Sequence, residues 1–181
     1  MKNRVLSWEL AGIFFIAATG SLLHFVFEWS GNLAPVALIA AVNESVWEHL
    51  KLAFWPSLLF AAVEYPFLRR EARNFVAAKT AGFYVTPLVI VLVFYSYTAL
   101  LGRSILIVDI ATFVVAVAAG QLVSCRVMTL GALSKSLQYL SVGALVLLTL
   151  AFSLFTYFPP HLPLFQDSRN GSYGIPAGIV R

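Results

Sequence analysis

The sequence contains little charge and almost no cysteine. Only 11% of its 181 residues are charged and 60% are hydrophobic, whereas soluble domains average about 25% charged residues. This deficit of charge excludes a disordered chain and a soluble enzyme of conventional type. Cys125 is the single cysteine and cannot form an internal disulfide, which also excludes a disulfide scaffold. The twelve lysines and arginines form no basic stripe, so we expect no nucleic-acid partner.

Long hydrophobic runs account for most of the chain. A helix needs about 20 apolar residues to cross a hydrocarbon core about 30 Å thick. The runs of sufficient length cover residues 5–27, 46–68, 75–101, 105–123 and 137–158. Each run is apolar on every side, whereas the polarity of a barrel strand alternates. The sequence therefore predicts an all-α integral membrane protein with a single bundle of five transmembrane helices.

Two segments lie outside these runs. Segment 33–42 is apolar but too short to span a membrane, which predicts a short re-entrant or interfacial helix. Segment 159–181 is rich in proline and glycine yet keeps several aromatic residues. We therefore expect a transmembrane bundle of residues 1–158, followed by an extracytoplasmic C-terminal tail, residues 159–181, packed on its outer face.

Basic residues are unevenly distributed between the two sides of such a bundle. With the N-terminus inside, eight of the twelve lie in cytoplasmic segments, three lie outside and Lys51 lies within a span. This asymmetry follows the positive-inside rule. We therefore expect a protein of the bacterial cytoplasmic membrane, with the N-terminus inside, the C-terminus outside and membrane lipid as its immediate partner.

Polar side chains are concentrated at one side of this predicted bundle. A charge at the centre of a bilayer costs about 2.5–3.5 kcal/mol on insertion scales, so charged residues in apolar runs indicate function unless they lie at the interface. In the orientation above, such residues from successive spans meet at the outer leaflet. The candidate ligand-binding residues are His24, Glu28, Asn43, Glu44, Trp47, Glu48, His49, Lys51 and Asp109.

The spacing of these residues predicts how they pair. His24 and Glu28 are four residues apart and share a helix face, as do Glu44, Glu48 and Lys51. Two carboxylates on one face repel each other unless a cation, a proton or a basic partner lies between them. We expect Lys51 to pair with Glu48 and a histidine to pair with Glu44 or Glu28.

Structural interpretations of the same residues stay open. Ser45-Val46-Trp47-Glu48 fits a capping box, in which Glu48 does no more than start a helix. Glu64 is expected to pair with an arginine of the following loop, namely Arg69, Arg70 or Arg73. In this interpretation the protein is a structural membrane subunit without a ligand.

The chemistry of the cluster leaves binding, transport and catalysis open. Histidines and carboxylates are ligands for a divalent metal, and those available here are His24, Glu44, Glu48 and His49. No H-E-x-x-H motif supports such a site. Without catalysis the cluster would bind or transport a small cation or a polar lipid head group. With a bound metal it would form an intramembrane metal-dependent enzyme that activates water against a lipid substrate.

The C-terminal tail carries apolar residues that a free tail would expose to water. We expect it to fold back as an ordered cap over the polar cluster. Gly171 and Gly174 are expected to form its tight turns, and Asp167 or His161 is expected to lie near the mouth of the pocket.

Two motifs resemble a known family. The first is NESVWEHLK, residues 43–51, and the second is PPHLPLFQD, residues 159–167, followed by GSYGI, residues 171–175. Together they resemble an uncharacterised family of small bacterial multi-span membrane proteins, described only as a domain of unknown function. The likeness covers nearly the whole chain. It implies the membrane architecture and emphasises the two motifs, but it implies no reaction.

Overall fold

The computed structural model describes residues 2–176 and is helical throughout. Its five α-helices are α1 (Lys2–Trp29), α2 (Val46–Leu68), α3 (Phe75–Leu101), α4 (Leu106–Met128) and α5 (Lys135–Leu154). Two short 3-10 helices, Ala34–Leu38 and Pro163–Phe165, lie in the connecting segment and in the tail. The α-helical bounds agree closely with the apolar runs. The end of the predicted tail, residues 177–181, lies outside the described residues.

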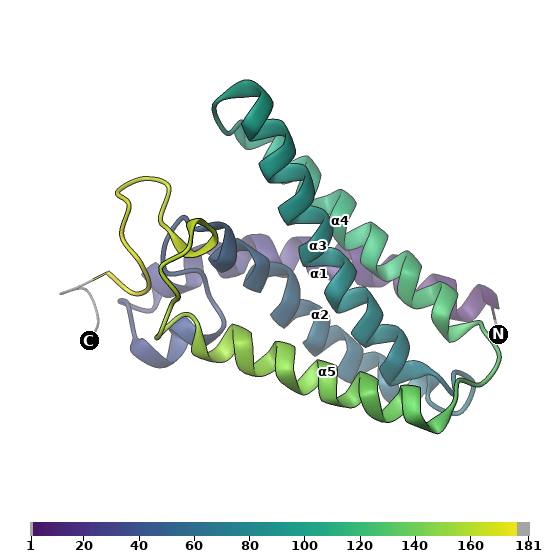
Figure 1. The fold of residues 1–181 in the computed structure, drawn as a ribbon. Helices are drawn as coiled ribbons and strands as arrows, with labels where there is room; N and C mark the ends of the chain where they lie inside the picture. Colours follow the sequence, from purple (N-terminus) through teal and green to yellow (C-terminus); the bar gives the residue numbers. More distant parts are fainter. Residues whose placement is uncertain (1, 177–181) are drawn as a thin grey trace.

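Helix α2 occupies the centre of the bundle (Figure 1). It buries thirteen of its 23 residues, whereas α5 buries only Phe152. Many large apolar side chains of the surrounding helices are instead exposed on the outside, including Leu100, Ile107 and Leu147. Exposed apolar surface of this extent, on helices of membrane-spanning length, is typical of a membrane protein.

Four helices, not the expected five, are both long and apolar enough to cross a membrane: α1, α3, α4 and α5. Helix α2 is long enough but carries Glu48, Lys51 and Glu64, which lower its hydropathy. All three charged side chains are at most 2% exposed. The charged side chains of α2 therefore point into the protein, where other segments of the chain cover them.

The predicted short helix in segment 33–42 forms as a 3-10 helix of five residues, Ala34–Leu38, with Pro35 in its first turn. Asn32 and Gly31 have φ values of 64° and 71°, which reverses the chain after α1. Ala37 and Ala40 are fully buried. The segment therefore packs beneath the end of the bundle.

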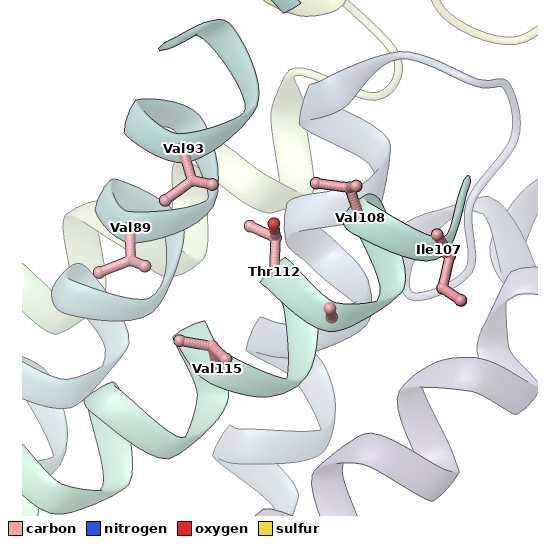
Figure 2. Close-up of a pocket in the computed structure, with 7 residues that line it drawn as sticks. Val89, Val93, Ile107, Val108, Thr112 and Val115 are labelled. Atoms are coloured by element: carbon pink, nitrogen blue, oxygen red, sulfur yellow. The ribbon is translucent and has the colours of Figure 1, made fainter. Parts of the chain in front are cut away.

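Helices α3 and α4 form a hairpin whose tip projects away from the other helices (Figure 1). An apolar crevice of about 440 Å³ lies between them near the tip. Figure 2 shows Val89 and Val93 of α3 on one side of it and Thr112 and Val115 of α4 on the other. Thr112 is the only lining residue with a hydroxyl group, so the crevice offers almost no polar group to a ligand.

Further along the hairpin, α3 and α4 approach each other through glycines. A Cβ atom added to Gly120 would lie 2.1 Å from Thr86 Oγ1 and 2.8 Å from the Gly82 carbonyl oxygen. Close backbone contact through small residues is the usual means of helix association in membranes, where lipid removes the hydrophobic driving force.

Replacing Gly120 by alanine should therefore destabilise the protein by about 1–3 kcal/mol, the usual cost of overpacking. Gly143→Ala is the matched control, because a Cβ at this position of α5 meets nothing within 4 Å. We expect the control to melt at or slightly above the temperature of the unaltered protein in the same detergent. Equal melting temperatures for Gly120→Ala and the control would contradict the close contact.

Candidate functional site

The candidate residues separate into an accessible cluster and a buried ion pair. The accessible group, called here the His–Glu cluster, consists of His24, Glu44 and His49. His24 lies near the end of α1, Glu44 in the loop before α2 and His49 in the first turn of α2. The buried ion pair consists of Glu48 and Lys51.

The three members of the His–Glu cluster face a common point. One ligand atom from each residue lies within 4.8 Å of the other two. His24 Nε2 is 3.8 Å from Glu44 Oε1, and His49 Nε2 is 3.5 Å from Glu44 Oε2. These distances are too long for hydrogen bonds. They approach the separation of about 3.4 Å between ligands in a tetrahedral site with metal–ligand bonds near 2.0–2.1 Å.

The imidazole ring of His49 is oriented by the backbone. Its Nδ1 lies 2.8 Å from the Ser45 carbonyl oxygen. Since a carbonyl can only accept, Nδ1 carries the hydrogen, and Nε2 of the neutral ring directs its lone pair toward Glu44. Metal-binding histidines commonly donate their other ring N–H to a carbonyl or carboxylate in this manner.

The C-terminal tail packs over the His–Glu cluster. Arg169 Nη2 lies 3.0 Å from Glu44 Oε1, and its side chain is 74% exposed. Ser168 Oγ donates to the Glu44 carbonyl oxygen at 3.2 Å. The Asn43 side-chain amide donates to the Gly174 carbonyl oxygen at 2.8 Å. The tail therefore places one exposed cation directly on the carboxylate of the cluster.

The details of the tail differ from the expectation. Gly171 and Gly174 do form turns, with φ values of 74° and 67°. His161, however, packs against Tyr173, with ring centroids 4.6 Å apart. Asp167 accepts from the Arg169 backbone N–H at 2.8 Å, so its carboxylate orders the turn. Asp167 nevertheless lines a hollow beside Glu44, and Arg169 is the tail side chain that forms an ion pair with the cluster.

A hollow of about 340 Å³ adjoins Glu44, between α3 and the tail. Its walls combine aromatic and polar side chains, including Phe94, Tyr95, Gln166 and Asp167. A ligand larger than an ion could therefore contact Glu44 from this side.

The buried ion pair joins three segments of the chain. Glu48 Oε2 lies 2.7 Å from Lys51 Nζ. Lys51 Nζ also donates to the Ala37 carbonyl oxygen and to Thr156 Oγ1, both at 2.7 Å. Thr156 donates in turn to Glu48 Oε1 at 2.9 Å, and the Val42 N–H donates to Glu48 Oε2 at 3.1 Å. These bonds connect α2 to the segment before it and to Thr156, which lies just after the C-terminal end of α5.

The predicted pairing of Glu48 with Lys51 is confirmed, but the predicted shared face of Glu44 and Glu48 is wrong. Helix α2 begins at Val46, and Ser45 is its N-cap, accepting from the Glu48 N–H at 3.3 Å. Glu44 therefore lies before the helix and points to the histidines, while Glu48 points inward. Only half of the capping box forms, because the Glu48 carboxylate binds Val42 instead of Ser45. Glu48 is consequently not a member of the metal-ligand group.

The other candidate residues lie away from the His–Glu cluster or have structural contacts. Trp47 packs against Phe152 and Phe165 at centroid distances of 4.6 and 4.7 Å. Glu28 is exposed and forms no ion pair within residues 2–176. Asp109 accepts a hydrogen bond from the Tyr97 hydroxyl at the tip of the α3–α4 hairpin.

The sequence predicts that Glu64 pairs with an arginine of the following loop, and this prediction is wrong. Glu64 contacts Lys79 of α3, which also lies 2.9 Å from Glu9 Oε2 of α1. All three side chains are at most 3% exposed. The position of Glu9 inside an apolar run was the sequence signal for this second charged site. Fifteen residues of α1 separate Glu9 from His24, or about 22 Å of helix.

The fold and these two charged sites define an all-helical protein with several helices of membrane-spanning length and ionisable groups at both ends of its bundle. The chain belongs to a family of unknown function, DUF6512, whose model matches residues 1–175. This membership confirms the predicted resemblance to a domain of unknown function over nearly the whole chain. No curated protein and no solved structure matches the chain.

Removing one partner of the Glu48–Lys51 pair should leave an uncompensated buried charge. We expect Lys51→Met to lower the free energy of unfolding by about 3–5 kcal/mol, and the double variant Glu48→Gln/Lys51→Met to recover part of this loss. Glu71→Gln is the control, because the Arg4–Glu71 pair is partly exposed and such pairs contribute about 0.2–1 kcal/mol. Denaturant titration in detergent measures all four proteins. Equal losses for Lys51→Met and Glu71→Gln would refute the coupling role of the buried pair.

Proposed function

We propose that this integral membrane protein binds a divalent transition-metal ion at the His–Glu cluster. The proposal is carried by one observation: two imidazole nitrogens and a carboxylate surround one point, and a backbone carbonyl fixes the ring of one histidine. Imidazole and carboxylate ligands suit zinc and related ions. Three protein ligands leave a fourth position for water or for a ligand in the adjoining hollow.

In this proposal all five helices cross the membrane. Helix α2 connects the end of α1 to the start of α3, which lie at opposite ends of the bundle (Figure 1). The other helices shield its charged groups from lipid. The distribution of basic residues supports an N-terminus inside and a C-terminus outside in a bacterial cytoplasmic membrane. The His–Glu cluster and the tail then face the outside.

Zinc titration of the purified full-length protein in detergent tests the metal site. We expect one ion per chain and a loss of affinity of at least about 100-fold in His49→Ala, because even the outer partners of metal ligands contribute 10–100-fold. His161→Ala is the matched control, since His161 packs on Tyr173 away from the cluster. Unchanged zinc affinity in His49→Ala would refute the proposed site.

Arg169 competes with a metal ion for Glu44, because its guanidinium group contacts the same carboxylate. Replacing Arg169 by glutamine should therefore raise zinc affinity about two- to fivefold, the equivalent of an exposed ion pair. Arg103→Gln, in the distant α3–α4 turn, serves as the charge-matched control. A lower zinc affinity in Arg169→Gln would show that the arginine supports binding instead of competing.

The hollow beside Glu44 favours a second candidate function, a metal-dependent enzyme that hydrolyses a lipid head group. The metal would lower the pKa of its bound water, and the hollow would hold the head group next to it. Zinc-loaded protein in lipid vesicles should then release the head group, and His49→Ala should not. Zinc flux into vesicles, without hydrolysis, would instead assign the cluster to transport.

A further inference from the structure

The second charged site contains more negative than positive charge. Glu9, Glu64 and Lys79 come from α1, α2 and α3, and their exposed fractions are 0%, 0% and 3%. Both carboxylates contact the same ammonium nitrogen, Lys79 Nζ. If every group is ionised, the site carries one uncompensated negative charge away from water, which costs several kcal/mol.

Hydrogen bonds distinguish the two carboxylates. Glu9 has a donor on each oxygen: Ser124 Oγ donates to Oε1 at 2.7 Å, and Lys79 Nζ donates to Oε2 at 2.9 Å. Glu64 contacts Lys79 through Oε2, and its Oε1 has no hydrogen-bond donor among the described residues. The ionised form of Glu9 is therefore stabilised at both oxygens, whereas no donor stabilises Oε1 of an ionised Glu64.

We infer that Glu64 is a proton-binding site, which takes up one proton from water to become a neutral carboxylic acid and so balances the charge of the Glu9–Lys79 pair. A proton fits this site better than a metal ion does. The Lys79 ammonium already lies against both carboxylates, so a further cation would face an ammonium at close range, whereas a proton adds its charge on the carboxylate itself.

The neighbouring groups leave this balance intact. On α4, Ser124 and Gln121 are uncharged, and Gln121 donates to the Glu9 backbone carbonyl oxygen rather than to a carboxylate. Cys125, also on α4 beside the site, carries no positive charge in either protonation state. Arg4, near the start of α1, and Glu71, in the loop between α2 and α3, balance each other's charge in their own pair. None of these groups supplies the second positive charge that two ionised glutamates require.

Infrared spectroscopy of the full-length protein in sodium-free detergent buffer at neutral pH tests this inference. Wild-type protein should show the C=O band of a protonated carboxyl group, shifted by deuterium exchange, which disappears in Glu64→Gln. Lys79→Met should about double the band, because both carboxyls are then buried without a cation. The exposed control Glu71→Gln should leave it unchanged.

Three outcomes would overturn the inference. These are a wild-type spectrum without a protonated carboxyl band at neutral pH, a band of undiminished size in Glu64→Gln, and loss of the wild-type band when sodium is added. The last would identify a cation site instead. The wild-type spectrum decides the question even where the variants fail to fold, and none of these measurements depends on the His–Glu cluster.

Discussion

The buried Glu48–Lys51 pair holds together the end of the bundle on which the accessible site depends. Its two charged side chains form hydrogen bonds with the Val42 N–H, the Ala37 carbonyl oxygen and the Thr156 hydroxyl. One ion pair therefore fixes both the segment before α2 and the residues that follow α5. Because Val42 and the N-cap Ser45 are both held, the two residues between them have little freedom. Glu44 is consequently presented to His24 and His49 instead of following Glu48 into the core.

The two sequence motifs, residues 43–51 and residues 159–167 with 171–175, meet in the tertiary structure. Trp47 of the first motif packs on Phe165 of the second, and the side chain of Asn43 donates to the Gly174 carbonyl oxygen. Ser168 and Arg169, which lie between the two parts of the second motif, contact Glu44. A tail separated from the end of α2 by 90 residues is thus part of the same site. This contact gives a physical reason for the joint presence of both motifs.

Helix α2 carries the ionisable groups that lipid would not tolerate. Glu48 and Lys51 lie at its start and Glu64 lies near its end, each turned toward another segment. Helix α2 packs against α1 and α3 and contacts α5 through Phe54 and Phe152. The more apolar α1, α3, α4 and α5 expose their large aliphatic side chains outward. This arrangement explains why α2, the helix with the most buried charged side chains, is also the most buried one. In a soluble protein the opposite arrangement would hold, because water solvates charges and excludes apolar surface.

The amino-acid sequence by itself determined the helices, because a run of apolar residues in a membrane must satisfy its backbone hydrogen bonds internally. It also determined the Glu48–Lys51 pairing, since residues three apart on a helix are neighbours. Only the tertiary structure decided which charges meet across helices. Glu64 pairs with Lys79 of another helix and not with the arginines of the following loop. The tail contributes Arg169 to Glu44, a contact that the sequence did not predict. Such contacts depend on the rotation and packing of whole helices, which local spacing does not encode. Because Ser45 is the N-cap of α2, Glu44 lies before the helix and Glu48 lies within it, and the two side chains point in different directions.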